Sequence, residues 1–269
     1  MFIVLYHYYY TFTFLYVTIF VQKTEGVTAL NRGTITDIDF FSESLQEDIH
    51  LLVYLPANYS PLYKYSVLIA SDGKDYFQLG RISRVVDEYL EQGDIENLII
   101  VGVPYKSVED RRQKYLPNGE KHEAYLRFLA HELVPYIDEH YSTYQMGMGR
   151  ALIGDSQAAT VSLLAAIQYP NIFGKVLMQS PLVNENVLEK VQQVQDVHAF
   201  SIYHVIGTKE HEVVTMDKSI KDFLTPNRAL HELIVNKGFS TFYDEFEGNH
   251  SWKFWQPDLK RVIKQNFSI

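Results

Sequence analysis

Apolar and polar residues alternate along two stretches in the first quarter of the chain. In TITDIDFF, from Thr34 to Phe41, and in DIHLLVYLP, from Asp48 to Pro56, apolar side chains recur at every second position or close to it. A period of two is typical of β-strands that bury one face. The two stretches therefore predict an opening antiparallel pair of strands.

Beyond this pair, the pattern changes to short apolar runs separated by amphipathic stretches. The runs SVLIAS and NLIIVGVP are each followed by helical spacing, near residues 82–92 and 122–140. In the second helix, Tyr125, Leu129 and Leu133 share one face. Strands that alternate with helices require crossover connections, which favour a parallel sheet.

The same alternation continues to the end of the chain. The runs ALIG, KVLMQS, FSIYHVIG and STFYDEF alternate with helices predicted near residues 157–168, 219–237 and 253–265. The pattern predicts an α/β fold with a mostly parallel central sheet of about eight strands, flanked by helices. A ligand site is expected at the carboxyl ends of the parallel strands.

The first 22 residues, MFIVLYHYYYTFTFLYVTIFVQ, contain no Lys, Arg, Asp or Glu. They are long enough to span a bilayer, but they lack the basic start and the small-residue end of a signal peptide. We interpret residues 1–27 as an apolar, aromatic-rich extension that reflects a start codon assigned too early. A membrane anchor or an export signal is the alternative. No repeat or change in composition divides residues 28–269, which we predict to be a single domain.

The composition excludes several classes of function. The net charge is −9, so the chain offers no broad basic face to nucleic acid. It contains no cysteine, which excludes disulfides, thiolate metal sites and a cysteine nucleophile. We expect a cytoplasmic protein that associates with membranes only if residues 1–22 are an anchor. The oligomeric state is left open.

The segment ALIGDSQAATVSLL places Ser156 between a predicted strand and a predicted helix. Gly154 lies two residues before it and Ala158 two residues after it, as in a nucleophile elbow, where only small residues fit around the sharp turn. Glycine is usual at the second of these positions, so Ala158 departs from the pattern. A simpler interpretation is that Asp155 or Ser156 caps the helix that follows.

A catalytic serine requires a base and a third group that orients the base. Glu210 follows the run FSIYHVIG, and His250 lies in the turn after STFYDEF. The order Ser156, Glu210, His250 is the order expected of an α/β-hydrolase triad. Glu212 and Asp217 remain alternatives for the acid.

The other histidines are less suited to catalysis or to metal binding. His198, His204, His211 and His231 lie in or beside predicted elements, where an isolated histidine is usually packed or solvated. His122 and His131 share a helix but are nine residues apart, and neither His131 nor His231 opens a complete HExxH motif. We therefore predict no metal site.

SDGKDYF, GDSQA, GTKE and GNHSWKFW together resemble the esterase family of α/β-hydrolases that includes enterochelin esterases, S-formylglutathione hydrolase, feruloyl and acetyl xylan esterases and the mycolyltransferases. The likeness extends from about Thr34 to Phe267. The segment RRQKYLP also resembles the family, and its Arg111 corresponds to a recurrent arginine. The resemblance implies an α/β-hydrolase fold.

The resemblance also implies an oxyanion hole built from two backbone amides. The donors would be the amide of Lys74, in the turn after the third strand, and the amide of Gln157, directly after the nucleophile. Two fixed donors stabilise the negative oxygen that develops during attack on an ester. Further candidates for the substrate pocket are Asp72, Gly73, Tyr76, Arg111, Asp155 and Trp252.

We expect a serine carboxylic-ester hydrolase that acts on a small-molecule ester, through an acyl-enzyme and without a cofactor. One alternative is an acyltransferase to a sugar or another alcohol, because water and alcohols can use the same machinery. The other is a noncatalytic binding protein on a hydrolase fold. Neither the substrate nor the acceptor follows from these residues.

Overall fold

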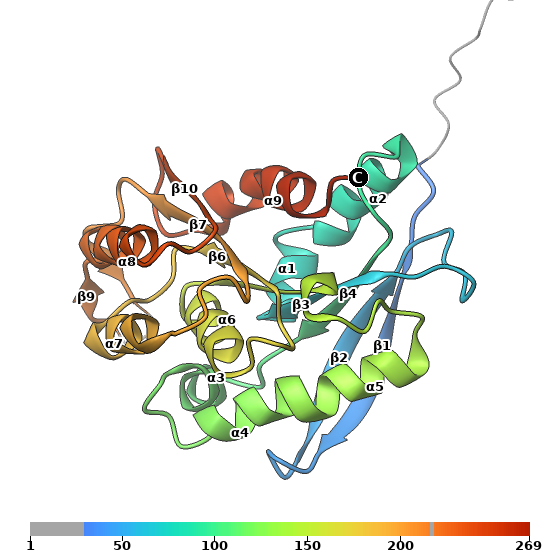
Figure 1. Cartoon of the computed structure of the whole chain (residues 1–269), viewed down its shortest axis with the longest axis horizontal. Coiled ribbons are helices and arrows are strands. Elements are labelled where there is room, and N and C mark those ends of the chain that lie inside the picture. Colours follow the sequence, from blue (N-terminus) through green and yellow to red (C-terminus); the bar gives the residue numbers. More distant parts are fainter. Residues whose placement is uncertain (1–29, 216–217) are drawn as a thin grey trace, which may run out of the picture.

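Eight strands form the central sheet of the computed structural model, which describes residues 30–215 and 218–269 (Figure 1). The strands are β1 (Thr34–Ser42), β2 (Glu47–Leu55), β3 (Ser66–Ser71), β4 (Leu98–Val103), β5 (Arg150–Asp155), β6 (Lys175–Gln179), β7 (Ser201–Gly207) and β10 (Thr241–Phe246). Their order across the sheet is β1-β2-β4-β3-β5-β6-β7-β10. β2 is antiparallel to both neighbours, and all other pairs are parallel. The predicted α/β class and mostly parallel sheet are confirmed.

Helices cover both faces of this sheet (Figure 1). One face packs against α2 (Ile82–Gln92) and α9 (Trp252–Phe267), through buried side chains such as Val86 and Val262. The other face packs against α4 (His122–Arg127), α5 (Val134–His140), α6 (Gln157–Gln168), α7 (Glu185–Gln193) and α8 (Leu224–Lys237). All residues of β3, β4 and β5 are buried, as expected of strands covered on two sides.

Two short helices precede and follow β4 near the carboxyl end of the sheet. They are α1 (Gly73–Gln78) and α3 (Val108–Tyr115), and the apolar pattern predicted neither of them. A Cβ on Gly73 would overlap the backbone of Gly102 in β4, so α1 approaches this strand more closely than any other residue type would allow.

The long helix predicted over residues 122–140 is continuous but changes its geometry in the middle. A π-helical stretch, Phe128–Leu133, joins α4 to α5. Pro135 is the second residue of α5, two positions after the end of this stretch. Proline has no N–H to donate and crowds the preceding turn of an α-helix, and the wider turn relieves this conflict.

The helix predicted near residues 219–237 begins later than expected. Ile220–Lys221 form strand β9, which pairs with β8 (Val213–Val214), and α8 begins at Leu224. The Asp222 carboxylate accepts a hydrogen bond from the Thr225 amide, and Pro226 follows in the first turn. Both features define a helix start.

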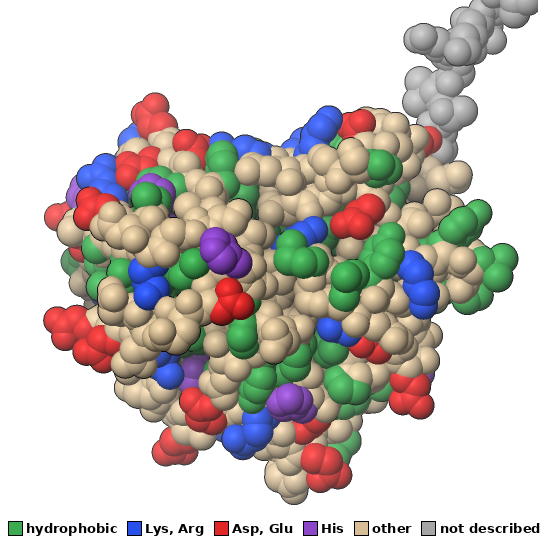
Figure 2. Space-filling view, in the orientation of Figure 1, with side chains coloured by type: hydrophobic (Ala, Val, Ile, Leu, Met, Phe, Trp, Pro, Cys, Tyr) green, Lys and Arg blue, Asp and Glu red, His purple; other side chains and the backbone are tan. Residues whose placement is uncertain are grey.

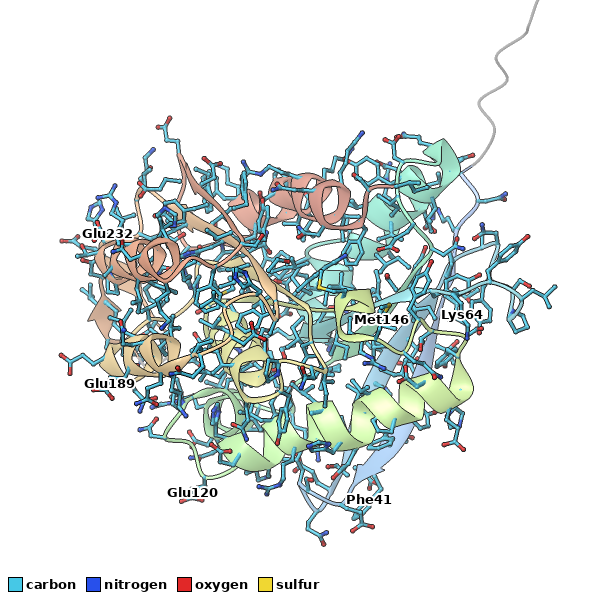
Figure 3. The ribbon with its side chains drawn as sticks, viewed as in Figure 1. Phe41, Lys64, Glu120, Met146, Glu189 and Glu232 are labelled. Atoms are coloured by element: carbon cyan, nitrogen blue, oxygen red, sulfur yellow. The ribbon has the colours of Figure 1, made fainter. Side chains whose placement is uncertain are left out.

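Charged side chains of both signs are interspersed on the surface. On the face drawn in Figure 2, Lys and Arg lie among Asp and Glu and form no continuous basic region. Glu120, Glu189 and Glu232 project outward from the edge of the molecule in Figure 3. Within residues 30–215 and 218–269, no helix is long and apolar enough to cross a membrane. Residues 1–27, interpreted above as an extension, lie outside the described residues.

A histidine within the sheet is completely buried. His204, in β7, bonds through Nε2 to the Asn227 side chain at 2.7 Å, while its Nδ1 has no partner. Burial lowers the pKa of His204 from 6.5 to about 4. The folded chain therefore keeps this ring neutral at a pH where the unfolded chain binds a proton.

We expect His204 to make the fold sensitive to acid. Its contribution to stability is complete above about pH 6.5 and is lost as the pH falls towards 4, by up to about 3 kcal/mol for a shift of this size. Urea unfolding of the wild type and of His204→Gln between pH 7 and pH 4 measures this loss, which should be smaller in the variant. His198→Gln, at an exposed position, is the control. Equal pH dependence in His204→Gln and wild type would contradict the assignment.

Candidate active site

A cavity of about 480 Å³ lies at the carboxyl end of the sheet. Its wall includes Ser156 after β5 and His250 after β10, together with Asp72 after β3. Apolar side chains from several other segments complete the wall: Leu79, Val108, Leu182, Val213, Val214, Phe223, Trp252 and Trp255. The cavity is where an α/β sheet is expected to bind a ligand.

Ser156 lies at a strained turn between β5 and α6. Its backbone angles are φ 54° and ψ −123°, a conformation that residues other than glycine rarely adopt. The surrounding segments hold the turn in place. The Ser156 amide donates to the Gln179 carbonyl at 2.9 Å, and the Leu182 amide donates to the Ser156 carbonyl at 3.2 Å. These features are those of a nucleophile elbow.

Gly154 and Ala158 contact each other across the elbow. A Cβ on Gly154 would overlap the backbone carbonyl group of Ala158, so the strand can approach the helix this closely only with glycine at position 154. The contact involves the backbone of Ala158 and not its methyl group. The departure from the usual glycine at position 158 is therefore compatible with a tight turn.

Glu210 and His250 form a close pair. Glu210 Oε2 lies 2.6 Å from His250 Nδ1, and the Glu210 side chain is fully buried. Its other oxygen accepts hydrogen bonds from Ser180 Oγ at 2.7 Å and from the Gly207 amide at 2.9 Å. These bonds fix the carboxylate, which in turn fixes the orientation of the imidazole.

Aromatic rings hold His250 from two sides. The ring of Phe223 lies 4.3 Å from that of His250, and the ring of Trp255 lies 4.8 Å away in an edge-on arrangement. Trp255 Nε1 also donates to Ser180 Oγ at 3.0 Å. Ser180 and Phe223 were missed in the sequence, because nothing in the local pattern marks a residue that acts through a distant contact.

Ser156 and His250 share the cavity, but among the residues that the structure describes, no hydrogen bond joins Ser156 Oγ to the imidazole. Such bonds are often long in a site without substrate and tighten when substrate binds. Of the alternative acids, Glu212 is exposed, and Asp217 lies outside the described residues. The carboxylate that bonds to His250 is that of Glu210.

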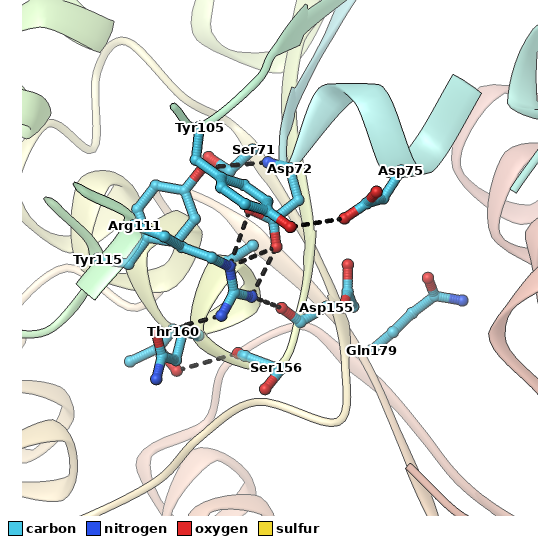
Figure 4. A network of polar contacts seen from close by, with 12 residues as sticks. Ser71, Asp72, Asp75, Tyr105, Arg111, Tyr115, Asp155, Ser156, Thr160 and Gln179 are labelled. Atoms are coloured by element: carbon cyan, nitrogen blue, oxygen red, sulfur yellow. Dashed lines mark hydrogen bonds and ion pairs between the residues drawn. The ribbon is translucent and has the colours of Figure 1, made fainter. Parts of the chain in front are cut away.

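Arg111 connects the segment after β3 with the elbow (Figure 4). Its guanidinium donates to both carboxylate oxygens of Asp72, at 2.6 to 3.0 Å. It also donates to the Gln157 side chain at 3.2 Å and to the Asp155 carbonyl at 3.4 Å. Arg111 and Asp72 are both buried, so the pair lies in an environment of low dielectric.

Lys74, a predicted oxyanion residue, lies in the first turn of α1 and not in an open loop. The amides at a helix start have no partner within the helix and are free to bind an anion. Gln157 is the first residue of α6, whereas Lys74 is the second residue of α1. The exposed side chain of Lys74 lines a different cavity from the one that contains Ser156.

Two further candidates lie behind the cavity wall. Tyr76 is fully buried, packs edge-on against Trp252 at 4.9 Å and donates to the Gln179 side chain at 3.2 Å. Gly73 is buried against β4. Neither is among the residues that line the cavity, whereas Asp72, Arg111, Asp155 and Trp252 are.

Two carboxyl groups in the cavity wall have raised pKa values. Burial is the main cause for both Asp155 and Asp75, and the nearby Asp72 carboxylate adds to the effect. The Tyr105 hydroxyl lies 3.5 Å from Asp75. Within the described residues, no group of three or more His, Cys, Asp or Glu residues is arranged to hold a metal ion.

The fold is that of the α/β-hydrolase esterases. A ferulic acid esterase superposes with a TM-score of 0.72 at 17% identity, covering 88% of this chain and 98% of its own. The enterobactin esterase FES from Shigella flexneri, in the presence of enterobactin, superposes with a TM-score of 0.73 at 17% identity, covering 87% of this chain and 58% of its own.

The model of the esterase family described as "Putative esterase" matches residues 42–265, and the chain belongs to this family. The YjcH protein of Bacillus subtilis (strain 168), described as uncharacterized, is 54% identical over 237 residues, which are 88% of this chain and 99% of YjcH. An acetyl esterase from Caldicellulosiruptor saccharolyticus is 21% identical over 258 residues, or 86% of this chain and 97% of the relative. The chain is accordingly an esterase, a hydrolase of carboxylic esters.

The close contact between Gly154 and the backbone of Ala158 can be tested by substitution. We expect Gly154→Ala to lower the free energy of unfolding by about 1–3 kcal/mol, because the new methyl group would meet the backbone of α6. Ala158→Gly, the matched control, adds no atom and should cost at most about 1 kcal/mol. Urea unfolding of both variants gives the two values. Wild-type stability in Gly154→Ala would show that the turn is looser than described.

Proposed function

We propose that the chain hydrolyses a small-molecule carboxylic ester through an acyl-enzyme, with Ser156, His250 and Glu210 as the catalytic triad. The observation that carries this proposal is the 2.6 Å contact between Glu210 and His250 in the wall of the cavity that also contains Ser156. An acid fixed by two further hydrogen bonds, a histidine oriented by it and a serine at a strained elbow are the parts that this chemistry needs.

In the first half of the reaction, Ser156 Oγ attacks the ester carbonyl carbon while His250 Nε2 takes the hydroxyl proton. The Glu210 carboxylate stabilises the imidazolium that forms. The carbonyl oxygen becomes negative and accepts hydrogen bonds from the Lys74 and Gln157 amides. The bond to the alcohol then breaks, and His250 returns its proton to the leaving oxygen.

In the second half, His250 removes a proton from water, which attacks the acyl-enzyme carbonyl. The tetrahedral intermediate collapses, the acid product leaves, and the proton on His250 returns to Ser156. All bonds and protons are accounted for by these residues and water. Each oxyanion donor is expected to stabilise the transition state by about 3 kcal/mol.

Labelling with a fluorophosphonate probe tests the assignment, because the probe reacts with an activated serine and forms a stable adduct. We expect the wild type to be labelled and Ser156→Ala to resist labelling. Glu210→Gln should lower the labelling rate by at least about 100-fold, because the amide cannot stabilise the imidazolium. Mass spectrometry of the intact protein measures the rates.

Glu212→Gln is the matched control, since Glu212 is an exposed acid two residues from Glu210. Its labelling rate should equal that of the wild type. Persistent labelling of Ser156→Ala would exclude this serine as the nucleophile. An equal loss of rate in Glu210→Gln and Glu212→Gln would remove the argument for Glu210.

A further inference from the structure

The triad and the oxyanion hole assign no role to the carboxyl of Asp155 in the cavity wall. This residue directly precedes Ser156, is 6% exposed and lines the same cavity. Its Oδ1 atom is enclosed and has no hydrogen-bond partner. Most buried polar atoms have a partner, so an exception in the wall of a binding cavity points to a group on the ligand.

Among the described residues, no hydrogen bond or ion pair joins a cation to the Asp155 carboxyl. Arg111 directs its donors to the Asp72 carboxylate, to the Gln157 side chain and to the backbone carbonyl of Asp155. The nearby side chains of Asp72 and Asp75 are both acidic. Burial and the Asp72 charge raise the pKa of Asp155 well above its usual range. The raised pKa favours the uncharged carboxylic acid form of this residue in the cavity wall.

An uncharged carboxylic acid offers one hydrogen-bond donor and an acceptor. A hydroxyl group also has one donor and an acceptor, so it can donate a hydrogen bond to the carboxyl group or accept one from it. A cationic amine is a poorer match, because Arg112 and Lys221 line the same cavity. A carboxylate is also a poorer match at this position, because the Asp72 charge would oppose it.

We propose that Asp155 is a specificity-determining residue that holds a hydroxyl group of the substrate, on the acyl or the alcohol part, beside the carbonyl that Ser156 attacks. The preferred substrates are then hydroxylated esters. This inference rests on the proposed function, since it takes Ser156 as the nucleophile. It adds a chemical class of substrate that the triad itself does not specify.

Two matched pairs of esters test the preference. p-Nitrophenyl butyrate and p-nitrophenyl 3-hydroxybutyrate differ on the acyl side, and propyl butyrate and glyceryl monobutyrate differ on the alcohol side. We expect wild-type kcat/KM to favour the hydroxylated member of at least one pair by about tenfold or more. An ester without the hydroxyl group would leave the buried Asp155 carboxyl unpaired. Asp155→Leu should bring that ratio close to one.

Asp155→Asn is the matched control, because the carboxamide keeps an uncharged donor and acceptor at the same place. It should retain the preference that Asp155→Leu loses. Infrared spectroscopy at pH 7 gives a second measurement: a C=O band of a protonated carboxyl group should be present in the wild type and absent from Asp155→Asn. These two results decide the question even if Asp155→Leu does not fold.

The proposal is overturned if the wild type prefers neither hydroxylated ester, if Asp155→Leu keeps the preference, or if the protonated-carboxyl band is missing. It is also overturned if the wild type hydrolyses p-nitrophenyl 3-aminobutyrate better than the 3-hydroxybutyrate and Asp155→Asn loses this preference for the amine. That result would indicate a charged carboxylate at position 155. In all these cases Ser156 labelling is unaffected. Failure of the proposed function appears separately, as labelling or hydrolysis that survives Ser156→Ala.

Discussion

The buried ion pair between Arg111 and Asp72 is the interaction on which the geometry of the candidate site depends. It joins the segment after β3, where Lys74 lies, to the elbow after β5, where Gln157 lies. These segments are far apart in sequence, and the proposed oxyanion hole requires their amides to converge on one point. A buried pair of this kind tolerates little change, because removing one partner leaves an uncompensated charge that costs about 3–5 kcal/mol.

Two residues at the turns that this pair joins, Asp72 and Ser156, have backbone conformations that favour glycine. Asp72 has φ 60° and Ser156 has φ 54°, and such strain costs about 1–3 kcal/mol at each position. Hydrogen bonds help to offset the cost: the Asp72 amide donates to the Tyr115 hydroxyl, and the Ser156 amide donates to the Gln179 carbonyl in β6. The rigid sheet thus holds two strained turns around the cavity, and the Arg111 guanidinium fixes the distance between them.

Local periodicity was sufficient to predict the sheet and the longer helices, because buried strands and amphipathic helices have a strong pattern. The small residues around Ser156 and the chain order expected of a triad, rather than periodicity, predicted the elbow and the candidates Ser156, Glu210 and His250, which stay predictions. Periodicity missed α1, α3 and α7, which are only six, eight and nine residues long. It also missed Ser180, which contacts Glu210 from 30 residues away and has no local signature. The role of Arg111 as a bridge depends on three separate segments, so only their arrangement in space could indicate it.

The most direct test of this account is the kcat of Arg111→Lys on a simple ester. Lysine keeps the positive charge next to Asp72 but cannot donate to Asp72, Gln157 and the Asp155 carbonyl together. If the bridge aligns the two oxyanion amides, kcat should fall by at least about 100-fold, the cost of losing one donor, while KM changes little. A kcat equal to that of the wild type in a folded Arg111→Lys variant would contradict the account.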